Sequence, residues 1–137
     1  GTQSAGALEQ TLMELASVVS DPTPKLILAD ELEAITEPGA GARIIAGMLL
    51  AARAQKDTSM MLVTHLAPAI IDASGVDDFR VDGIEARGLD SDLELIVDRT
   101  PIRNHLARST PELIVKRLVE RSNGHAKSLF DDILQMF

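Results

Sequence analysis

The sequence predicts an α/β fold built around a parallel βαβ unit. Residues 26–29 and 60–63 are short apolar runs with the length of strands, and the segment between them has the apolar spacing of a helix. Each run is apolar throughout, which is typical of parallel strands covered on both faces. Strands joined through a helix pair in parallel, with a right-handed connection. A length of 137 residues is typical of one domain.

The first half of the chain supplies the helices of this unit. A first helix is expected over residues 6–19, with Ser4 as its N-cap and an Asp-Pro-Thr-Pro segment that ends it. Its apolar stripe consists of Leu8, Leu12, Leu15 and Val19. Residues 40–54 follow the break at Pro38-Gly39 and form the connecting helix. The inward side of that helix is expected to hold Ile44, Ile45, Met48, Leu49 and Ala52.

The second half changes to an alternating pattern, which predicts an antiparallel hairpin exposed on one face. The alternating residues are Phe79, Val81 and Gly83, then Leu93, Leu95 and Val97, with a turn at residues 88–91. Residues 99–108 are expected to form a loop, and the capping box at residues 109–112 begins a helix that runs to about Arg121. A last helix follows the turn at residues 122–124. Its apolar side holds Leu129, Phe130, Ile133, Leu134 and Phe137.

Composition limits the class of protein. The chain has no cysteine, which excludes disulfides and thiolate metal sites and fits an intracellular protein. No apolar run approaches the roughly 18 residues of a membrane span, so we expect a cytoplasmic protein without a membrane partner.

Charge is unevenly distributed along the chain. The formal net charge is −8, yet residues 99–127 hold seven Lys or Arg side chains and two acidic ones. This basic segment is either a solvated helix face or a contact for an anionic partner, nucleotide or nucleic acid. The acidic remainder argues against a whole surface that binds DNA.

Two acidic residues follow the first predicted strand. Asp30 and Glu31 come directly after a buried run, at the edge where ligands bind parallel α/β sheets. An Asp in this position holds Mg²⁺ in nucleotide-hydrolysing proteins, and a second carboxylate can orient or deprotonate the attacking water. The alternative is that both residues simply begin a loop.

Two further segments fit a nucleotide site. Thr64 and His65 follow the second strand, so they are expected near the two acids, where His65 is either a contact for phosphate or attacking water, or a structural hydrogen-bonding group. Ser4 and Gly6 open the first helix, whose free N–H groups either bind an anion or belong to an ordinary cap.

Taken in this order, the segments resemble the second half of an ABC-type ATPase domain, and most of all that of the DNA mismatch repair MutS group. The matching segments are SAGALEQT for the signature, with Ser4 and Glu9, LILADE for the Walker B strand, EPGAGARIIAG for the D-loop and its helix, and VTHL for the switch histidine. The hairpin and the two terminal helices also follow the family order, so the resemblance covers nearly the whole chain. One departure concerns residues 32–36, LEAIT, where MutS proteins usually carry a Gly-rich link.

The resemblance implies a P-loop NTPase fold and a role for each site residue. Asp30 would ligate Mg²⁺, Glu31 would polarise the attacking water, and His65 would contact the γ-phosphate of ATP. Ser4 and Gly6 would reach a nucleotide held by another subunit. Glu37, Pro38 and Gly39 would lie at that subunit interface, in a homodimer or heterodimer.

The sequence lacks one part of such a site. It contains no G-x-x-x-x-G-K-[ST] phosphate loop, so we expect a Walker A half and DNA-contacting domains further upstream, and a nucleoid-associated parent. The chain alone is expected neither to bind ATP tightly nor to hydrolyse it. Two alternatives are a non-catalytic dimerisation module that uses Phe130 and Phe137, and half of another ABC-type DNA-repair or chromosome ATPase.

Overall fold

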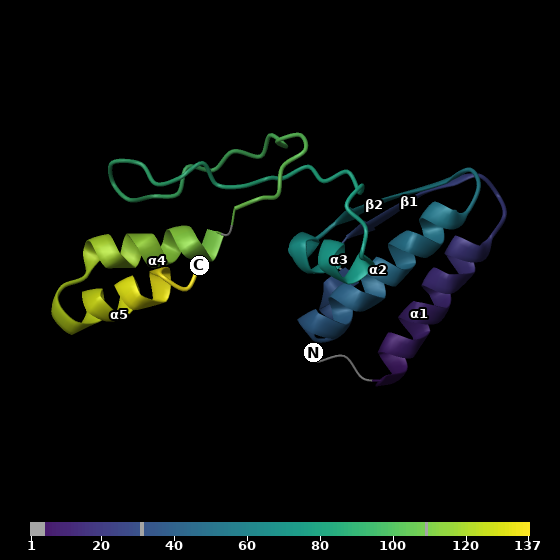
Figure 1. The fold of residues 1–137 in the computed structure, drawn as a ribbon, viewed down its shortest axis with the longest axis horizontal. Helices are drawn as coiled ribbons and strands as arrows, with labels where there is room; N and C mark the ends of the chain where they lie inside the picture. Colours follow the sequence, from purple (N-terminus) through teal and green to yellow (C-terminus); the bar gives the residue numbers. More distant parts are fainter. Residues whose placement is uncertain (1–4, 31, 109) are drawn as a thin grey trace. The chain divides into compact units, whose positions relative to one another are not determined.

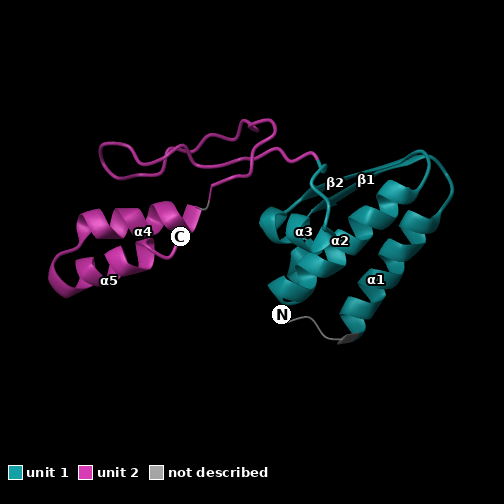
Figure 2. Ribbon diagram, in the orientation of Figure 1, with its two compact units in different colours: residues 1–79 teal, residues 80–137 magenta. Residues whose placement is uncertain are grey.

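The computed structural model describes residues 5–30, 32–108 and 110–137. The chain folds as two compact units, residues 1–79 and residues 80–137, and each is described by itself (Figure 2). Among the described residues, no helix combines the length and the apolar character needed to cross a membrane.

Unit 1 contains the predicted βαβ unit. Its elements are α1 (Ala5–Ser20), β1 (Lys25–Asp30), the 3₁₀ helix η1 (Leu32–Ile35), α2 (Pro38–Ala54), β2 (Thr58–Val63) and α3 (Ala67–Ser74). Strands β1 and β2 pair in parallel, from Lys25 opposite Thr58 to Asp30 opposite Val63. The α/β class and the strand–helix–strand order are therefore confirmed.

The core of unit 1 lies between the helices and one face of this sheet (Figure 1). One buried cluster joins α2 to α3 through Ala42, Ile45, Ala46 and Ile70. A second joins α1, β1 and α2 through Val19, Ile27 and Ala52. Ile45 and Ala52 are buried as predicted, whereas Ile44 and Leu49 are only half-buried because small alanines take the innermost positions of α2.

The prediction that both faces of the strands are covered is wrong for this chain. Side chains that alternate along β1 and β2 point away from the helices and are 61–69% exposed. They are Leu26, Leu28, Met61 and Val63, which we call the bare sheet face. The strands are apolar on both sides, but the described helices pack on one side only, so the second apolar face has no cover among the described residues of unit 1.

Helix α3 is an element that the sequence analysis did not predict. It begins directly after Leu66, has Pro68 in its first turn, and ends at Gly75, which has a left-handed φ of 71°. Proline fits the first turn of a helix and glycine fits the left-handed position at its end. With only eight residues, the helix has too few turns for a clear apolar period in the sequence.

Unit 1 ends at a clasp formed by Arg53, in the last turn of α2. Its guanidinium makes two hydrogen bonds to the Asp78 carboxylate, of 2.7 and 2.5 Å, and lies 5.4 Å from the centre of the Phe79 ring. A planar guanidinium suits both a paired carboxylate contact and an aromatic face. The end of α2 thus fixes the last residues of the unit.

Unit 2 begins with an antiparallel ribbon rather than with continuous strands. Its antiparallel direction is as predicted, with isolated bridges between Gly83 and Ile102 and between Leu89 and Leu95. Its turn, predicted at residues 88–91, lies instead at 90–94. The Asp90 carboxylate accepts hydrogen bonds from the backbone N–H groups of residues 92 and 94, which fixes this turn, and the expected loop at 99–108 joins the pairing through Ile102.

Two helices complete unit 2, α4 (Thr110–Arg121) and α5 (Gly124–Leu134), which pack side by side (Figure 1). Leu113 and Val119 of α4 are buried, whereas α5 has no buried residue. Ser109, the predicted cap of α4, lies outside the described residues. The predicted apolar side of α5 is therefore present, but α4 covers it only in part.

Candidate functional site

The parallel pairing brings Asp30 and His65 to the same edge of the sheet. Asp30 ends β1 opposite Val63, the last residue of β2, and His65 follows two positions later. Both side chains are exposed, and neither the carboxylate nor the imidazole makes a side-chain hydrogen bond or ion pair with another described residue. An acidic and a basic group thus stand available to a ligand at the carboxyl edge, where parallel sheets bind nucleotides.

Two predicted site residues, Glu31 and Ser4, lie outside the described residues. Their assignments as water-polarising base and signature serine stay predictions. Gly6 lies in the first turn of α1 and is exposed, as is Glu9 one turn later.

Glu37 has a local role in the structure as the N-cap of α2. Its carboxylate accepts hydrogen bonds from the N–H groups of Gly39 and Ala40, at 2.8 and 2.6 Å. These bonds, that from Ala40 foremost, lower the pKa of Glu37. Pro38 occupies the first turn and Gly39 is exposed, so this segment begins α2 in the way that N-terminal caps usually do.

Glu33 is a site residue that the sequence analysis missed. From η1, its Oε1 atom accepts hydrogen bonds from the Thr64 hydroxyl at 3.0 Å and from the His65 backbone N–H at 2.8 Å. The segment after β1 therefore holds the segment after β2. The one signal available was an acidic residue in LEAIT, where the MutS group usually has a Gly-rich link.

Asp30 offers an exposed carboxylate to a metal ion at this edge. No group of three His, Cys, Asp or Glu side chains converges anywhere within residues 5–30, 32–108 and 110–137. Mg²⁺ in nucleotide sites takes one or two carboxylates and completes its shell with phosphate oxygens and water. The unpaired carboxylate of Asp30 fits that requirement.

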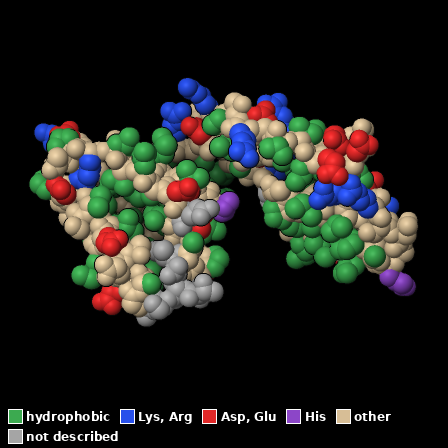
Figure 3. Space-filling view, turned by 180° about the vertical axis from the view of Figure 1, so that it is seen from behind, with side chains coloured by type: hydrophobic (Ala, Val, Ile, Leu, Met, Phe, Trp, Pro, Cys, Tyr) green, Lys and Arg blue, Asp and Glu red, His purple; other side chains and the backbone are tan. Residues whose placement is uncertain are grey.

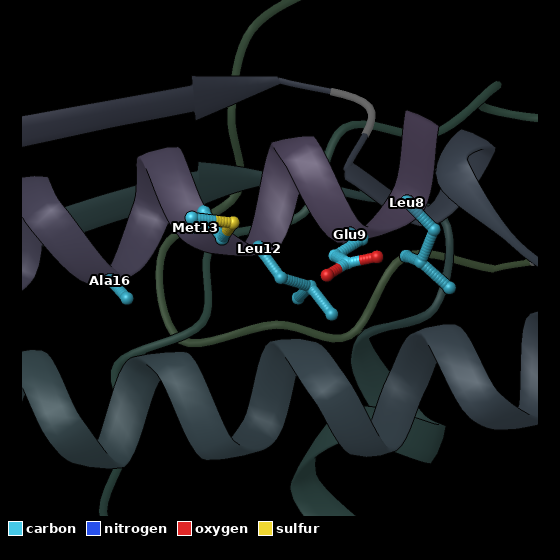
Figure 4. Close-up of a pocket in the computed structure, with 5 residues that line it drawn as sticks. All are labelled: Leu8, Glu9, Leu12, Met13 and Ala16. Carbon is cyan, nitrogen blue, oxygen red and sulfur yellow. The ribbon is translucent and has the colours of Figure 1, made fainter. Parts of the chain in front are cut away.

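Two hollows among the described residues are lined by helices. Figure 4 shows side chains along α1 that line an open groove, Leu8, Glu9, Leu12, Met13 and Ala16. Because all of them come from one helix, the groove is an unfilled helix face rather than an enclosed site. A second hollow of about 330 Å³ lies between α2 and α3 and includes Gly39 and Arg43.

Part of the basic segment is engaged within unit 2. Arg108, Arg117 and Arg121 each donate a hydrogen bond to a backbone carbonyl of the ribbon, and the latter two also pair with Glu94. Arg117 and Arg121 join α4 to the ribbon, and Arg108 makes its contact within the ribbon, which favours the structural interpretation for these three residues.

Comparison with known proteins gives one informative match. The chain is 45% identical over 133 residues to the DNA-binding protein MutS2 of Pyrococcus furiosus. The matched region covers 97% of this chain and 23% of the length of that relative. No family model and no solved structure matches the chain. The predicted resemblance is thereby confirmed: over almost its whole length, this chain is a relative of one segment of a MutS-family protein.

Proposed function

We propose that this chain is part of an ATP-hydrolysing, DNA-associated MutS-like protein with a P-loop NTPase fold. The observation that carries the proposal is the placement of Asp30 and His65 at one carboxyl edge by the β1–β2 register. The identity to a relative named as DNA-binding supports the association with DNA, and hence with the nucleoid. The chain spans under a quarter of that relative, which leaves room for DNA contacts in other parts of such a protein.

In this proposal each residue at the edge has one task. Bound ATP and Mg²⁺ supply the reacting phosphoryl group and the cation that offsets its charge. Asp30 holds the cation, Glu31 orients the attacking water and accepts its proton, and His65 donates a hydrogen bond to a phosphate oxygen. Ser4 and Gly6 belong to a composite site, in which they serve a nucleotide bound by a partner subunit across an interface that includes residues 37–39.

The test is ATP hydrolysis after this chain is combined with a phosphate-loop half of a MutS-family ATPase domain. We expect turnover from the combination and none from the chain alone. Glu31→Gln should lower kcat by about 10²–10⁴-fold, as loss of a catalytic base does. Asp30→Asn, His65→Ala and Ser4→Ala should also lower turnover.

Asp57→Asn is the matched control for Asp30→Asn. Asp57 lies just before β2, at the opposite edge of the same sheet, and its φ of 59° suits asparagine as well as aspartate. The control should keep full turnover. Unchanged turnover in the Asp30 and Glu31 variants, or turnover by the chain alone, would contradict the proposal.

A second candidate function is dimerisation without catalysis. Hydrophobic side chains gather on the helical part of unit 2 (Figure 3). On and near α5 they include Leu129, Ile133, Met136 and Phe137, with Met136 85% exposed. This candidate predicts that the chain associates with itself through α5.

A further inference from the structure

Glu33 connects the segments that follow the two strands. Besides the two hydrogen bonds that its Oε1 accepts, its Oε2 atom is buried and has no hydrogen-bond partner among the described residues. The Thr64 hydroxyl, which donates to Glu33, accepts in turn from the N–H of Leu66 at 2.9 Å. The Glu33 carboxylate thus holds Thr64 and His65 directly, and Leu66 through the Thr64 hydroxyl.

The carboxylate is suited to this task by its charge. Burial raises the pKa of Glu33, but the hydrogen bonds from the His65 N–H, from its own N–H and from the Thr64 hydroxyl, together with nearby His65, outweigh it and leave a lowered pKa. Glu33 is therefore ionised at neutral pH, and hydrogen bonds to an ionised acceptor are shorter and stronger than neutral ones.

The connection is anchored in the core on both sides. Leu32, next to Glu33, and Leu66, next to His65, both pack against the buried cluster of α2 and α3. The backbone around His65 is thus held by the packing of Leu66 and by the Glu33 carboxylate, while the imidazole remains exposed.

We infer that Glu33 is a positioning residue that fixes the backbone of His65 and so sets where the imidazole lies relative to Asp30. This inference rests on the proposed function, because it assigns Glu33 a part in presenting His65 to the nucleotide. Glu33 differs from the exposed Asp30, because its Oε1 already accepts two hydrogen bonds and its Oε2 is buried.

The first test is independent of ATP and uses the 137-residue chain. Hydrogen exchange of the His65 amide, followed by NMR, should be at least about tenfold faster in Glu33→Ala and faster in Thr64→Val than in the parent. Thr64→Ser keeps the hydroxyl and should restore slow exchange. Glu85→Gln is the matched control, because Glu85 makes the same kind of contact in unit 2, to His105 and to the N–H of Arg108, and should leave the His65 amide unchanged.

The second test uses the combined ATPase. A misplaced imidazole should lower kcat by about 10-fold to 100-fold in Glu33→Ala with KM changed less than about twofold. Combined with His65→Ala, the Glu33 change should cause almost no additional loss, because both remove the same interaction. If Glu33 only stabilised the fold, its substitution would lower kcat by the same factor whether residue 65 is histidine or alanine.

Each result decides the inference. Unchanged exchange of the His65 amide in Glu33→Ala and Thr64→Val overturns it, as do additive losses in the double variant. Normal turnover in Glu33→Ala, together with a large loss in His65→Ala, overturns the inference alone. Normal turnover in His65→Ala overturns the role proposed for His65, and the inference with it.

Discussion

Asp30 and Glu33, three positions apart, have opposite environments. The Asp30 carboxylate is exposed and makes no side-chain hydrogen bond to a described residue, whereas the Glu33 carboxylate is engaged by Thr64 and His65. A ligand site needs an exposed carboxylate such as that of Asp30, and a fixed loop needs an engaged one such as that of Glu33. The two acids therefore divide the tasks of binding and of holding.

The lowered pKa of Glu33 predicts a dependence of stability on pH. A carboxylate with a folded-state pKa below its ordinary value of 4.5 adds stability above that value and loses it as the pH falls through the folded-state pKa. Glu33→Gln should thus lose less of its free energy of unfolding than the parent when the pH falls from about 6 to about 3. Urea unfolding at several pH values measures this difference. If the free energy of unfolding changed equally with pH in the parent and in the variant, the prediction would be contradicted.

The sequence could predict Asp30 and His65 as exposed site residues, but not Glu33, which fixes the backbone of His65. Asp30 and His65 each follow an apolar run, which is a local pattern. The contact from Glu33 to Thr64 joins residues 31 positions apart. Glu33 lies in the 3₁₀ helix η1, which no periodic pattern in the sequence predicts. Only the register of β1 with β2 places Glu33 and Thr64 together.

At the level of elements, long periodic segments were predicted well and short or irregular ones were not. Helices α1, α2, α4 and α5 and both strands lie where the apolar spacing places them. The short helix α3 and the turn of the ribbon differ from the prediction, because caps and the side chain of Asp90 determine them rather than periodicity.

Substitution by alanine should have opposite effects on stability at two glycines. A Cβ atom on Gly83 would lie 2.7 Å from the His105 carbonyl oxygen and 2.9 Å from the Ala107 nitrogen, so the backbone of the ribbon would have to move. Gly83→Ala should destabilise unit 2 by about 1–3 kcal/mol. Gly47, inside α2, has open space at that position, and Gly47→Ala should stabilise unit 1 by about 0.5–1 kcal/mol.

Hydrogen exchange of both units measures these two effects separately. Exchange should become faster in the ribbon of the Gly83 variant and slower in α2 of the Gly47 variant. Equal effects of both substitutions would show that the close approach at Gly83 does not constrain the ribbon.

At the level of the whole molecule, the bare sheet face is the largest departure from the prediction. Its four apolar side chains lie on a two-stranded sheet, in which each strand is an edge strand with one unpaired side. Exposed apolar surface and unpaired strand edges both favour association with other chains. A longer protein, such as the MutS2 relative, has ample chain to cover such a face.

The bare sheet face and the apolar side of α5 should contribute differently to self-association of the isolated chain. We expect that Leu28→Lys with Met61→Lys reduces self-association more than Leu129→Lys with Phe137→Lys, because the sheet face combines apolar side chains with open edges. Sedimentation velocity over a range of concentrations measures the difference. Met13→Lys, an equally exposed position on α1, is the control. The opposite order would favour the dimerisation module.

The clasp of Arg53 has a consequence for the order of events during synthesis. Its two partners, Asp78 and Phe79, are the last residues of unit 1, and they close onto a helix made 25 residues earlier. Chains fold from the N-terminus as they leave the ribosome, and domains fold as units. The first unit can therefore close once residue 79 has emerged, before the helices of the second have left the ribosome.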